Sequence, residues 1–431
     1  MPFNENFLQF VWKYKLFFRP EMHTQDGSKL QVLSVGRHNR DAGPDFEEAR
    51  LRIGEETWCG HVEIHKRASE WYAHKHHLDK AYNTVVLHVV YEDDRIVHRE
   101  DGTKVDTLEL KNLLMPGVLE QYQLLSESKS WIACAAQIGT VDSFKVKQWL
   151  SRILIERLQA KSRYVLQLVD EYQGDWNQAA YVALARNFGF KVNAAPFEQL
   201  AKSLPYALLQ KHRHRFLSVE SLVFGQSGLL AGEKDGDDAY LASLRTEYQF
   251  LSKQHKLQAI DTASWKFMRM RPANFPTLRL AQFAHLCASV PSLFSAMVDG
   301  APEHFIESLA QVEGSSYWKQ HYVFSKEGKE HSTRLGQNAV NNILINTVVI
   351  LLFAYGRYVD KESYLCSAVS LLEKLVAEDN HVIRQFEALG VKAAEAADSQ
   401  ALLQLKSSYC EQRRCLECGI GLELFKFNKT L

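Results

Sequence analysis

Residues 36–65 read GRHNRDAGPDFEEARLRIGEETWCGHVEIH. Within them, segments 49–53 and 58–65 alternate apolar and polar residues with a period of two, which is typical of β-strands. A Gly-Pro-Asp-Phe turn precedes the first segment, and a second turn joins the two. We therefore expect a β-hairpin here, and the rest of the chain is interpreted around it.

One face of the second expected strand carries chemical groups. Val62 and Ile64 share one face, whereas the other face presents His61, Glu63 and His65. Asp45 lies at the start of the preceding strand, so two acids are expected to converge from adjacent strands. Hard divalent cations prefer carboxylate oxygens, and a bound cation activates water and stabilises charge on a phosphate. We predict an Mg²⁺ or Mn²⁺ site at Asp45 and Glu63; the alternative is that Asp45 caps the turn and Glu63 pairs with a surface cation.

Residues Pro44-Asp45 and Glu63-Ile64-His65 resemble the PD-(D/E)XK nuclease superfamily. The resemblance implies a metal-dependent enzyme that cuts phosphodiesters of DNA or RNA. It also implies that Asp45 and Glu63 hold the metal, with the carbonyl of Ile64 as a third ligand. His65 stands where the superfamily has a lysine, and Lys66 points to the opposite strand face.

His65 is therefore the variable part of the expected site. An imidazole there can act as a base near neutral pH, or it can ligate the metal directly. A mixed site of Glu63 with His65 and either His61 or His88 would favour Mn²⁺, Zn²⁺ or Fe²⁺ over Mg²⁺. The alternative for His88, which lies within an apolar strand, is a hydrogen-bonded core residue.

The longer pattern HN-DAGPDF, W-G-VEIH, S-W and LHVV is similar to a family of uncharacterised bacterial proteins. That resemblance spans the whole chain and brings no established activity.

The segments around the hairpin complete an αβββαβ order. Periodicity predicts helices over 4–18 and 69–82, strands over 30–35 and 85–90, and an edge hairpin over 97–110 with Asp101-Gly102 as its turn. In the second helix only His74 and His77 share a face, and we expect its three histidines to be solvated. This order is the core that the nuclease resemblance implies. We place the end of the α/β domain at residue 115.

Beyond residue 115 the apolar spacing becomes helical. Helices are expected over 142–170, 176–188, 196–211, 238–255, 277–288, 303–312, 334–356, 361–378 and 380–395. We therefore predict an α+β protein. Its domains are a nuclease-like α/β domain over 1–115, an α-helical domain over 116–405 with a subdomain break near 225–240, and a cysteine-containing segment over 406–431.

The composition narrows the class of protein. Of the 431 residues, 46% are hydrophobic and 24% are charged, as in a soluble globular protein. Lys+Arg and Asp+Glu both total 51, so a surface for nucleic acid must be local. The N-terminus lacks a signal-peptide layout, and the apolar run 343–355 is too short to span a membrane and is expected to be a buried helix. We expect a reduced, cytoplasmic protein without a membrane segment.

Local basic groups are the candidates for binding nucleic acid. Arg37 and Asn39 precede the Gly-Pro-Asp turn, at the rim of the expected site. Phosphate contacts are also expected from Arg269, Arg271 and Arg279, with Trp265, Phe267 and Phe275 interleaved for stacking. The alternative for any such cluster is a solvated surface.

Three cysteines near the C-terminus form the second motif. Cys410, Cys415 and Cys418 have the spacing C-x4-C-x2-C, and thiolates in a reduced compartment bind Zn²⁺ or iron–sulfur clusters strongly. A fourth ligand would come from Cys134, Cys366 or a histidine. By analogy, some PD-(D/E)XK nucleases carry such a cluster as a structural clasp. The alternative is three unligated thiols.

Three functions follow from these patterns. The first is a divalent-metal-dependent nuclease-like protein in which Asp45, Glu63 and His65 are catalytic. The second is an inactive protein of the same fold that binds nucleic acid or serves as a scaffold. The third is a non-nuclease metalloenzyme that uses histidines and Glu63. The oligomeric state is not indicated by the sequence.

Overall fold

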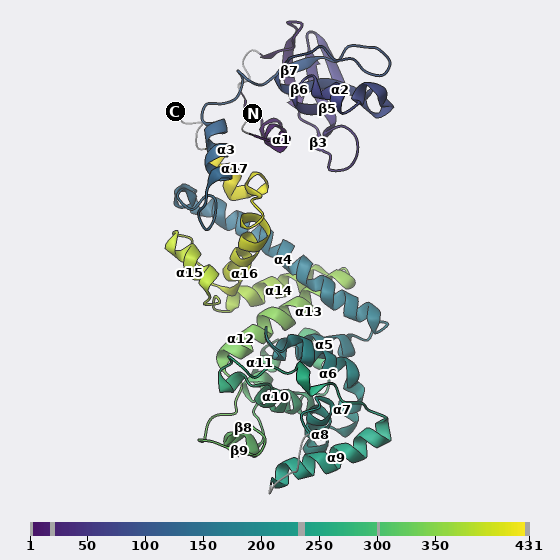
Figure 1. Cartoon of the computed structure of the whole chain (residues 1–431), viewed down its shortest axis with the longest axis vertical. Helices are drawn as coiled ribbons and strands as arrows, with labels where there is room; N and C mark the ends of the chain where they lie inside the picture. Colours follow the sequence, from purple (N-terminus) through teal and green to yellow (C-terminus); the bar gives the residue numbers. More distant parts are fainter. Residues whose placement is uncertain (1–2, 18–21, 232–237, 300–301, 427–431) are drawn as a thin grey trace. The chain divides into compact units, whose positions relative to one another are not determined.

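The computed structural model describes residues 3–17, 22–231, 238–299 and 302–426 (Figure 1). The chain divides into two compact units. The first unit comprises Met1–Leu150, Arg384–Lys392 and Leu402–Leu431, and the second comprises Ser151–Ile383 and Ala393–Ala401. The sheet lies in the first unit and most helices lie in the second, so the predicted α+β class is confirmed. The predicted boundary at residue 115 falls inside the first unit.

The first unit contains a mixed sheet between short helices. Its elements are α1 (Glu5–Lys13), β1 (Met22–His23), β2 (Lys29–Ser34), β3 (Arg37–His38), β4 (Phe46–Ile53), β5 (Glu56–Arg67), α2 (Glu70–Ala73), β6 (Val85–Glu92) and β7 (Thr107–Glu109). The strands lie in the order β1-β2-β4-β5-β6-β7, and β3 pairs with β4. The order α1, β2, β4, β5, α2, β6 matches the predicted succession of helix, three strands, helix and strand.

The sheet changes direction at its centre. Strands β2, β4 and β5 pair antiparallel, whereas β5, β6 and β7 pair parallel. The register places Glu63 beside His88 and His65 beside Val90. The residues of β5 from Val62 to His65 are buried on both faces, as is typical of a parallel pair at the middle of a sheet. The polar groups on β5 therefore lie in the interior.

A bulge in β4 lies next to the predicted site. Phe46 pairs with Val62 but Ala49 pairs with Gly60, so β4 has one extra residue. Glu48 in this bulge has φ +56°, a left-handed conformation, and its N–H group donates to Nδ1 of His61. This bond holds the His61 ring at the bulge.

The expected helix over 69–82 is interrupted, which corrects the sequence prediction. Only α2 and two single 3₁₀ turns form, His76–Leu78 and Lys80–Tyr82. Lys75 has φ +64° and breaks the helix, and Ser69 donates to Asp94 rather than capping α2. The break decides where the histidines of this segment point.

The predicted turn at Asp101-Gly102 is present. His98 and Lys104 form an antiparallel bridge across it, and Gly102 has φ +80°. The segment after the turn, β7, joins the sheet parallel to β6. The predicted edge hairpin therefore reduces to this bridge.

The remaining helices of the first unit come from distant parts of the chain. They include α3 (Val118–Glu127), α15 (His381–Ala388) in part, a π-helical turn (Lys406–Cys410), a 3₁₀ turn (Cys415–Glu417) and α17 (Gly419–Lys426). Phe425 of α17 packs on Phe10 of α1, with ring centroids 4.8 Å apart. The C-terminal segment is thus part of the same unit as the sheet. The predicted end of the first helix, Phe18, lies outside the described residues.

The second unit is helical. Its elements are α4 (Ser143–Glu171, which begins in the first unit), α5 (Trp176–Phe188), α6 (Ala194–Ser203), α7 (Tyr206–His212), α8 (Phe216–Gln226), α9 (Ala239–His255), α10 (Pro276–Ser289), α11 (Pro302–Ala310), β8 (His321–Val323), β9 (Lys326–Glu327), α12 (Gln337–Ile343), α13 (Val349–Tyr358), α14 (Glu362–Lys374) and part of α16 (Ala396–Leu405). Most of the predicted helices are present. Pro205 separates α6 from α7, and the loop proposed as a subdomain break includes residues 232–237, outside those described.

The most apolar helix lies inside this unit. A π-helical turn (Leu344–Val348) joins α12 to α13, giving a continuous helix over Gln337–Tyr358. This helix of 22 residues is long and apolar enough to span a membrane, so the expectation that the run is too short was wrong. Its most apolar stretch is 78% buried within the structure. The prediction of a buried helix is confirmed.

Candidate functional site

The two predicted acids meet at the junction of β4 and β5. The backbone N–H of Asp45 donates to Oε2 of Glu63 at 3.1 Å, and the N–H of Ile64 donates to Oδ2 of Asp45 at 3.0 Å. Gln9 of α1 donates from Nε2 to Oδ1 of Asp45 at 2.8 Å. These three bonds fix both carboxyl groups at one point, and Glu63 is only 6% exposed.

A third acid, Glu5 of α1, adds to this cluster. Glu5 and Gln9 are four residues apart and share one face of the helix, so Glu5 approaches His65 of β5 while Gln9 bonds to Asp45. Burial, and then Asp45 and Glu63, raise the pKa of Glu5 to about 7. Burial and the Glu63 carboxylate raise the pKa of Asp45, and burial raises the pKa of Glu63. Acids in this state share protons near neutral pH and are a ready site for a cation.

A chain of imidazole rings begins beside the acids. Nδ1 of His65 lies 2.8 Å from Nε2 of His88, and Nε2 of His65 lies 3.0 Å from Nδ1 of His74. His65 is 1% exposed and His88 is fully buried. Burial and the neighbouring histidines lower the pKa of His65, and burial lowers that of His88 to about 3. Both rings are therefore neutral at physiological pH, and a neutral imidazole has a lone pair that can ligate a metal.

His76 connects the histidines to the acids. Its Nε2 lies 3.2 Å from Oε1 of Glu63, which is also 3.6 Å from Nε2 of His65. Among the described residues, one group of three or more metal-binding side chains has donor atoms that all lie within 4.8 Å of one another, and it consists of His65, His74 and His76. The geometry thus offers nitrogen ligands directly beside the carboxylates.

The left-handed Lys75 explains this convergence. A continuous helix would turn His74 and His76 away from each other, because they are two residues apart. The break after α2 instead brings both rings to within 5.2 Å of the His65 ring, while His77 packs on Tyr72. The expectation that these histidines are solvated is wrong for His76, which is buried. His74 is exposed, as expected, but it is also bonded to His65.

The model of a family described as "Protein of unknown function (DUF2851)" matches residues 5–381. The chain belongs to this family. No curated protein and no solved structure matches the chain significantly.

The family match covers both the acid pair and the histidine cluster. It also includes Glu5, Gln9, His74 and His76, which the sequence patterns did not single out. The i, i+4 pair Glu5 and Gln9 looks like the ordinary polar face of an amphipathic helix. His76 was hidden because the helix break at Lys75 has no Gly or Pro to mark it.

The polar loop before Asp45 is mostly internally bonded. Asn39 donates from Nδ2 to the carbonyls of Ala42 and Pro44 and accepts from the N–H of Asp41, so it shapes the Gly-Pro-Asp turn. Arg37 is exposed and forms an ion pair with Glu47. Of these two predicted contacts for nucleic acid, Arg37 retains an accessible guanidinium.

The predicted cluster in the helical unit changes character in the structure. Arg279 is 6% exposed and donates to Gln282 and Asn274, so it is a core residue rather than a phosphate ligand. Trp265 is also buried, and its indole N–H donates to Ser227. Only Arg269 and Arg271 remain exposed.

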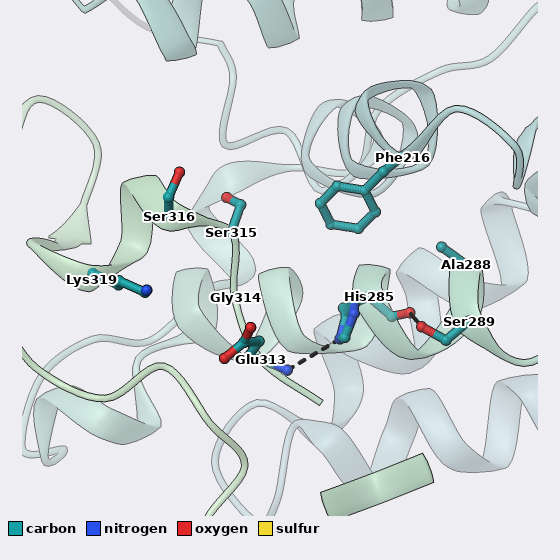
Figure 2. A pocket seen from close by; sticks show the side chains of 9 residues that line it. All are labelled: Phe216, His285, Ala288, Ser289, Glu313, Gly314, Ser315, Ser316 and Lys319. Carbon is teal, nitrogen blue, oxygen red and sulfur yellow. Dashed lines mark hydrogen bonds between the residues drawn. The ribbon is translucent and has the colours of Figure 1, made fainter. Parts of the chain in front are cut away.

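The helical unit has a pocket of its own (Figure 2). It lies between α8, α10 and the segment after α11. Two of its polar side chains are paired: His285 accepts from the N–H of Glu313, and Ser315 bonds to Glu220 and Tyr240. None of the predicted site residues lines this pocket.

Proposed function

We propose that the first unit is a divalent-metal-dependent phosphodiesterase that acts on nucleic acids, with Asp45 and Glu63 as the metal ligands. The observation that carries this proposal is the meeting of the buried Glu63 of β5 with the half-buried Asp45 at the start of β4. Burial raises the pKa values of both acids and so disfavours their ionised forms. A divalent cation bound between them would stabilise these ionised forms.

The connectivity around the acids supports this proposal. Asp45 directly precedes β4, Glu63 lies within β5, and β6 runs parallel to β5. This is the arrangement that the nuclease resemblance implies. The N–H of Ile64 already points to Asp45, and in an extended strand the carbonyl of the same residue faces the same neighbouring strand. The Ile64 carbonyl is therefore available as the third ligand.

Each side chain has a separate task in the proposed reaction. Asp45 and Glu63 would hold an Mg²⁺ or Mn²⁺ ion, which supplies an activated water and stabilises charge on the phosphate. His65 would stand in place of the superfamily lysine as a neutral imidazole that orients the attacking water or ligates the metal through Nε2, since burial and the neighbouring histidines disfavour its protonated form. His88, bonded to Nδ1, would fix the tautomer and orientation of His65.

Cleavage of labelled single- and double-stranded DNA and RNA, with Mg²⁺, Mn²⁺ or EDTA, tests this function. Asp45→Asn and Glu63→Gln keep the shape of the site and remove its charge. Glu55→Gln, in the exposed turn between β4 and β5, is the matched control. We expect metal-dependent cutting by the wild type and the control, and loss of cutting in both site variants.

If the folded wild-type protein cuts no substrate with any of the metals, the proposal that the first unit is an enzyme is refuted. If nucleic acid still bound in the presence of EDTA, the inactive binding protein or scaffold would become the better account. Such binding would be expected to weaken with salt, since it would depend on phosphate contacts.

A second candidate function rests on the histidine cluster. His65, His74 and His76 with Glu63 form a mixed nitrogen and oxygen ligand set, which favours Zn²⁺, Mn²⁺ or Fe²⁺ over Mg²⁺. Such a centre would serve a non-nuclease hydrolase equally well. The two candidate functions are distinguished by measuring which metals remain bound to protein that is purified without added metal. Tightly bound Zn²⁺ or Fe²⁺, together with no cleavage of nucleic acid, would favour the non-nuclease metalloenzyme.

A further inference from the structure

Four of the five cysteines of the first unit gather in one place. They are Cys134, which precedes α4, and Cys410, Cys415 and Cys418 of the C-terminal segment. Burial is the main reason that the pKa values of Cys134 and Cys410 are raised, and the charges of nearby thiolates add to it. Cys418 and Cys415 act on Cys134. Cys418, Cys134 and Cys415 act on Cys410. Thiols influence each other in this way only when they are neighbours.

Packing of the flanking aromatic residues gives the same placement independently. Lys406 Nζ lies 5.1 Å from the centre of the Trp131 ring, three residues before Cys134. Trp149 packs edge-on against Tyr409 at 5.4 Å, next to Cys410. The segment that holds Cys134 and the segment that holds the other three cysteines therefore lie side by side.

The turn from Cys415 to Gly421 has a conformation that depends on glycine. A Cβ atom on Gly421 would lie 2.1 Å from the carbonyl oxygen of Cys415, and one on Gly419 would lie 2.6 Å from the Trp149 ring. The N–H of Cys418 donates to the carbonyl of Cys415. This tight turn brings the two thiols of the C-x2-C pair to the same end of α17.

Hydrogen-bond donors surround the sulfur of Cys418. The backbone N–H groups of Gly421 and Ile420 and the indole of Trp149 donate toward it. Burial nevertheless raises the pKa of Cys418 to about 11, so these donors offset only part of the cost of its anionic form, which is the form that binds metal. The thiol is 9% exposed, so these donors lie in a protected environment.

We propose that Cys134, Cys410, Cys415 and Cys418 together ligate an iron–sulfur cluster that fastens the C-terminal segment to the first unit. The run C-x4-C-x2-C is also found in plant-type ferredoxins, although their remote cysteine follows the run and Cys134 precedes it. The four thiols are also more widely spaced than a zinc ion requires. Tetrahedral Zn–S bonds of about 2.3 Å bring the sulfurs to within about 3.8 Å of one another. No three of these thiols satisfy even the 4.8 Å spacing that the histidine cluster meets in the described chain.

Analysis of the full-length protein, purified under anaerobic conditions from iron-supplied cells, tests the proposal. Iron, acid-labile sulfide and zinc are measured per chain, together with the visible absorbance of the cluster. Cys134→Ser and Cys415→Ser each remove one proposed ligand. Cys366→Ser, an exposed cysteine on α14 of the second unit, is the matched control.

We expect iron and sulfide in equal amounts in the wild type and in Cys366→Ser, and loss of most of both in the two ligand variants. X-ray absorption of wild-type protein supports the site if it shows iron bound by sulfur alone, whether or not a variant folds. Three results would overturn the proposal: iron content unchanged in Cys134→Ser, zinc with four sulfur ligands in place of iron, or seven reactive thiols without metal. None of these readouts depends on cleavage of nucleic acid.

Discussion

Replacing Glu63 with glutamine should make the metal-free protein more stable, because the site holds a charge that folding disfavours. The introduced amide would still accept the N–H bond from Asp45 through its oxygen, and its nitrogen could donate to His76. Burial raises the pKa of Glu63 from 4.5 to about 8, so the folded state holds a proton that the unfolded state has lost. The substitution removes this penalty while keeping the packing.

The magnitude follows from the shift in pKa. Between 4.5 and about 8 the difference is 3.5 units, and at about 1.36 kcal/mol per unit the ceiling is about 5 kcal/mol at pH 8. We expect about 1 to 3 kcal/mol, because the surroundings of the acid pair relax around a charge. Since the folded state binds more protons over this range, the wild type loses stability as pH rises from 4.5 to 8. The variant loses less, because only Asp45 and Glu5 of the acid cluster still titrate in it.

Urea unfolding in EDTA at pH 6.5, 7.5 and 8.5 measures this difference, with Glu55→Gln as the control. The advantage of Glu63→Gln over the wild type should grow with pH, and the control should show no such trend. Added Mn²⁺ should stabilise the wild type and leave Glu63→Gln nearly unchanged, because only the intact site binds it. A variant less stable than the wild type in EDTA at pH 8.5 would refute the reasoning, since it would mean that Glu63 is a structural partner of His76.

Three further predictions concern other parts of the chain. Burial lowers the pKa of Lys161 to about 8, so the folded state loses this proton at a lower pH than the unfolded state does. The stability of the wild type relative to Lys161→Met should therefore rise by about 2 to 3 kcal/mol between pH 7 and 10. Urea unfolding would contradict this if the difference in stability between the two proteins stayed the same at every pH. His74→Ala should weaken Zn²⁺ binding by about tenfold or more, as measured by calorimetry. His77 packs on Tyr72, so His77→Ala should bind Zn²⁺ as tightly as the wild type does. Equal affinities of the two variants would exclude His74 as a ligand. Gly421→Ala should lower the free energy of unfolding by about 1 to 3 kcal/mol, because its Cβ atom would clash with the Cys415 carbonyl. A Cβ atom on Gly336 would lie in open space, so Gly336→Ala should leave the stability unchanged. Equal melting temperatures of the two variants would contradict the tight turn at Gly421.

The sequence predicts the sheet well because its signals are local. Alternation over β4 and β5 and the apolar run of β6 each lie within one segment, and the acids sit at positions that the strand period determines. These predictions need no knowledge of how distant segments meet.

The parts that were missed depend on tertiary packing. Arg279 appears as a surface cation by type, but its partners Gln282 and Asn274 and the ring of Phe190 enclose it. Helix α8 is buried along most of its length, so it lacks the polar face by which a helix is recognised. The positive φ of Lys75, which creates the histidine cluster, is adopted by a residue type that rarely marks a break.

The most direct test of the account is the position of Mn²⁺ in crystals of the protein, found by anomalous scattering. We predict a peak in contact with carboxylate oxygens of both Asp45 and Glu63, which disappears in Asp45→Asn. A peak held by His65, His74 and His76 without Asp45, or no peak in this unit at a saturating concentration of Mn²⁺, would contradict the proposed metal site.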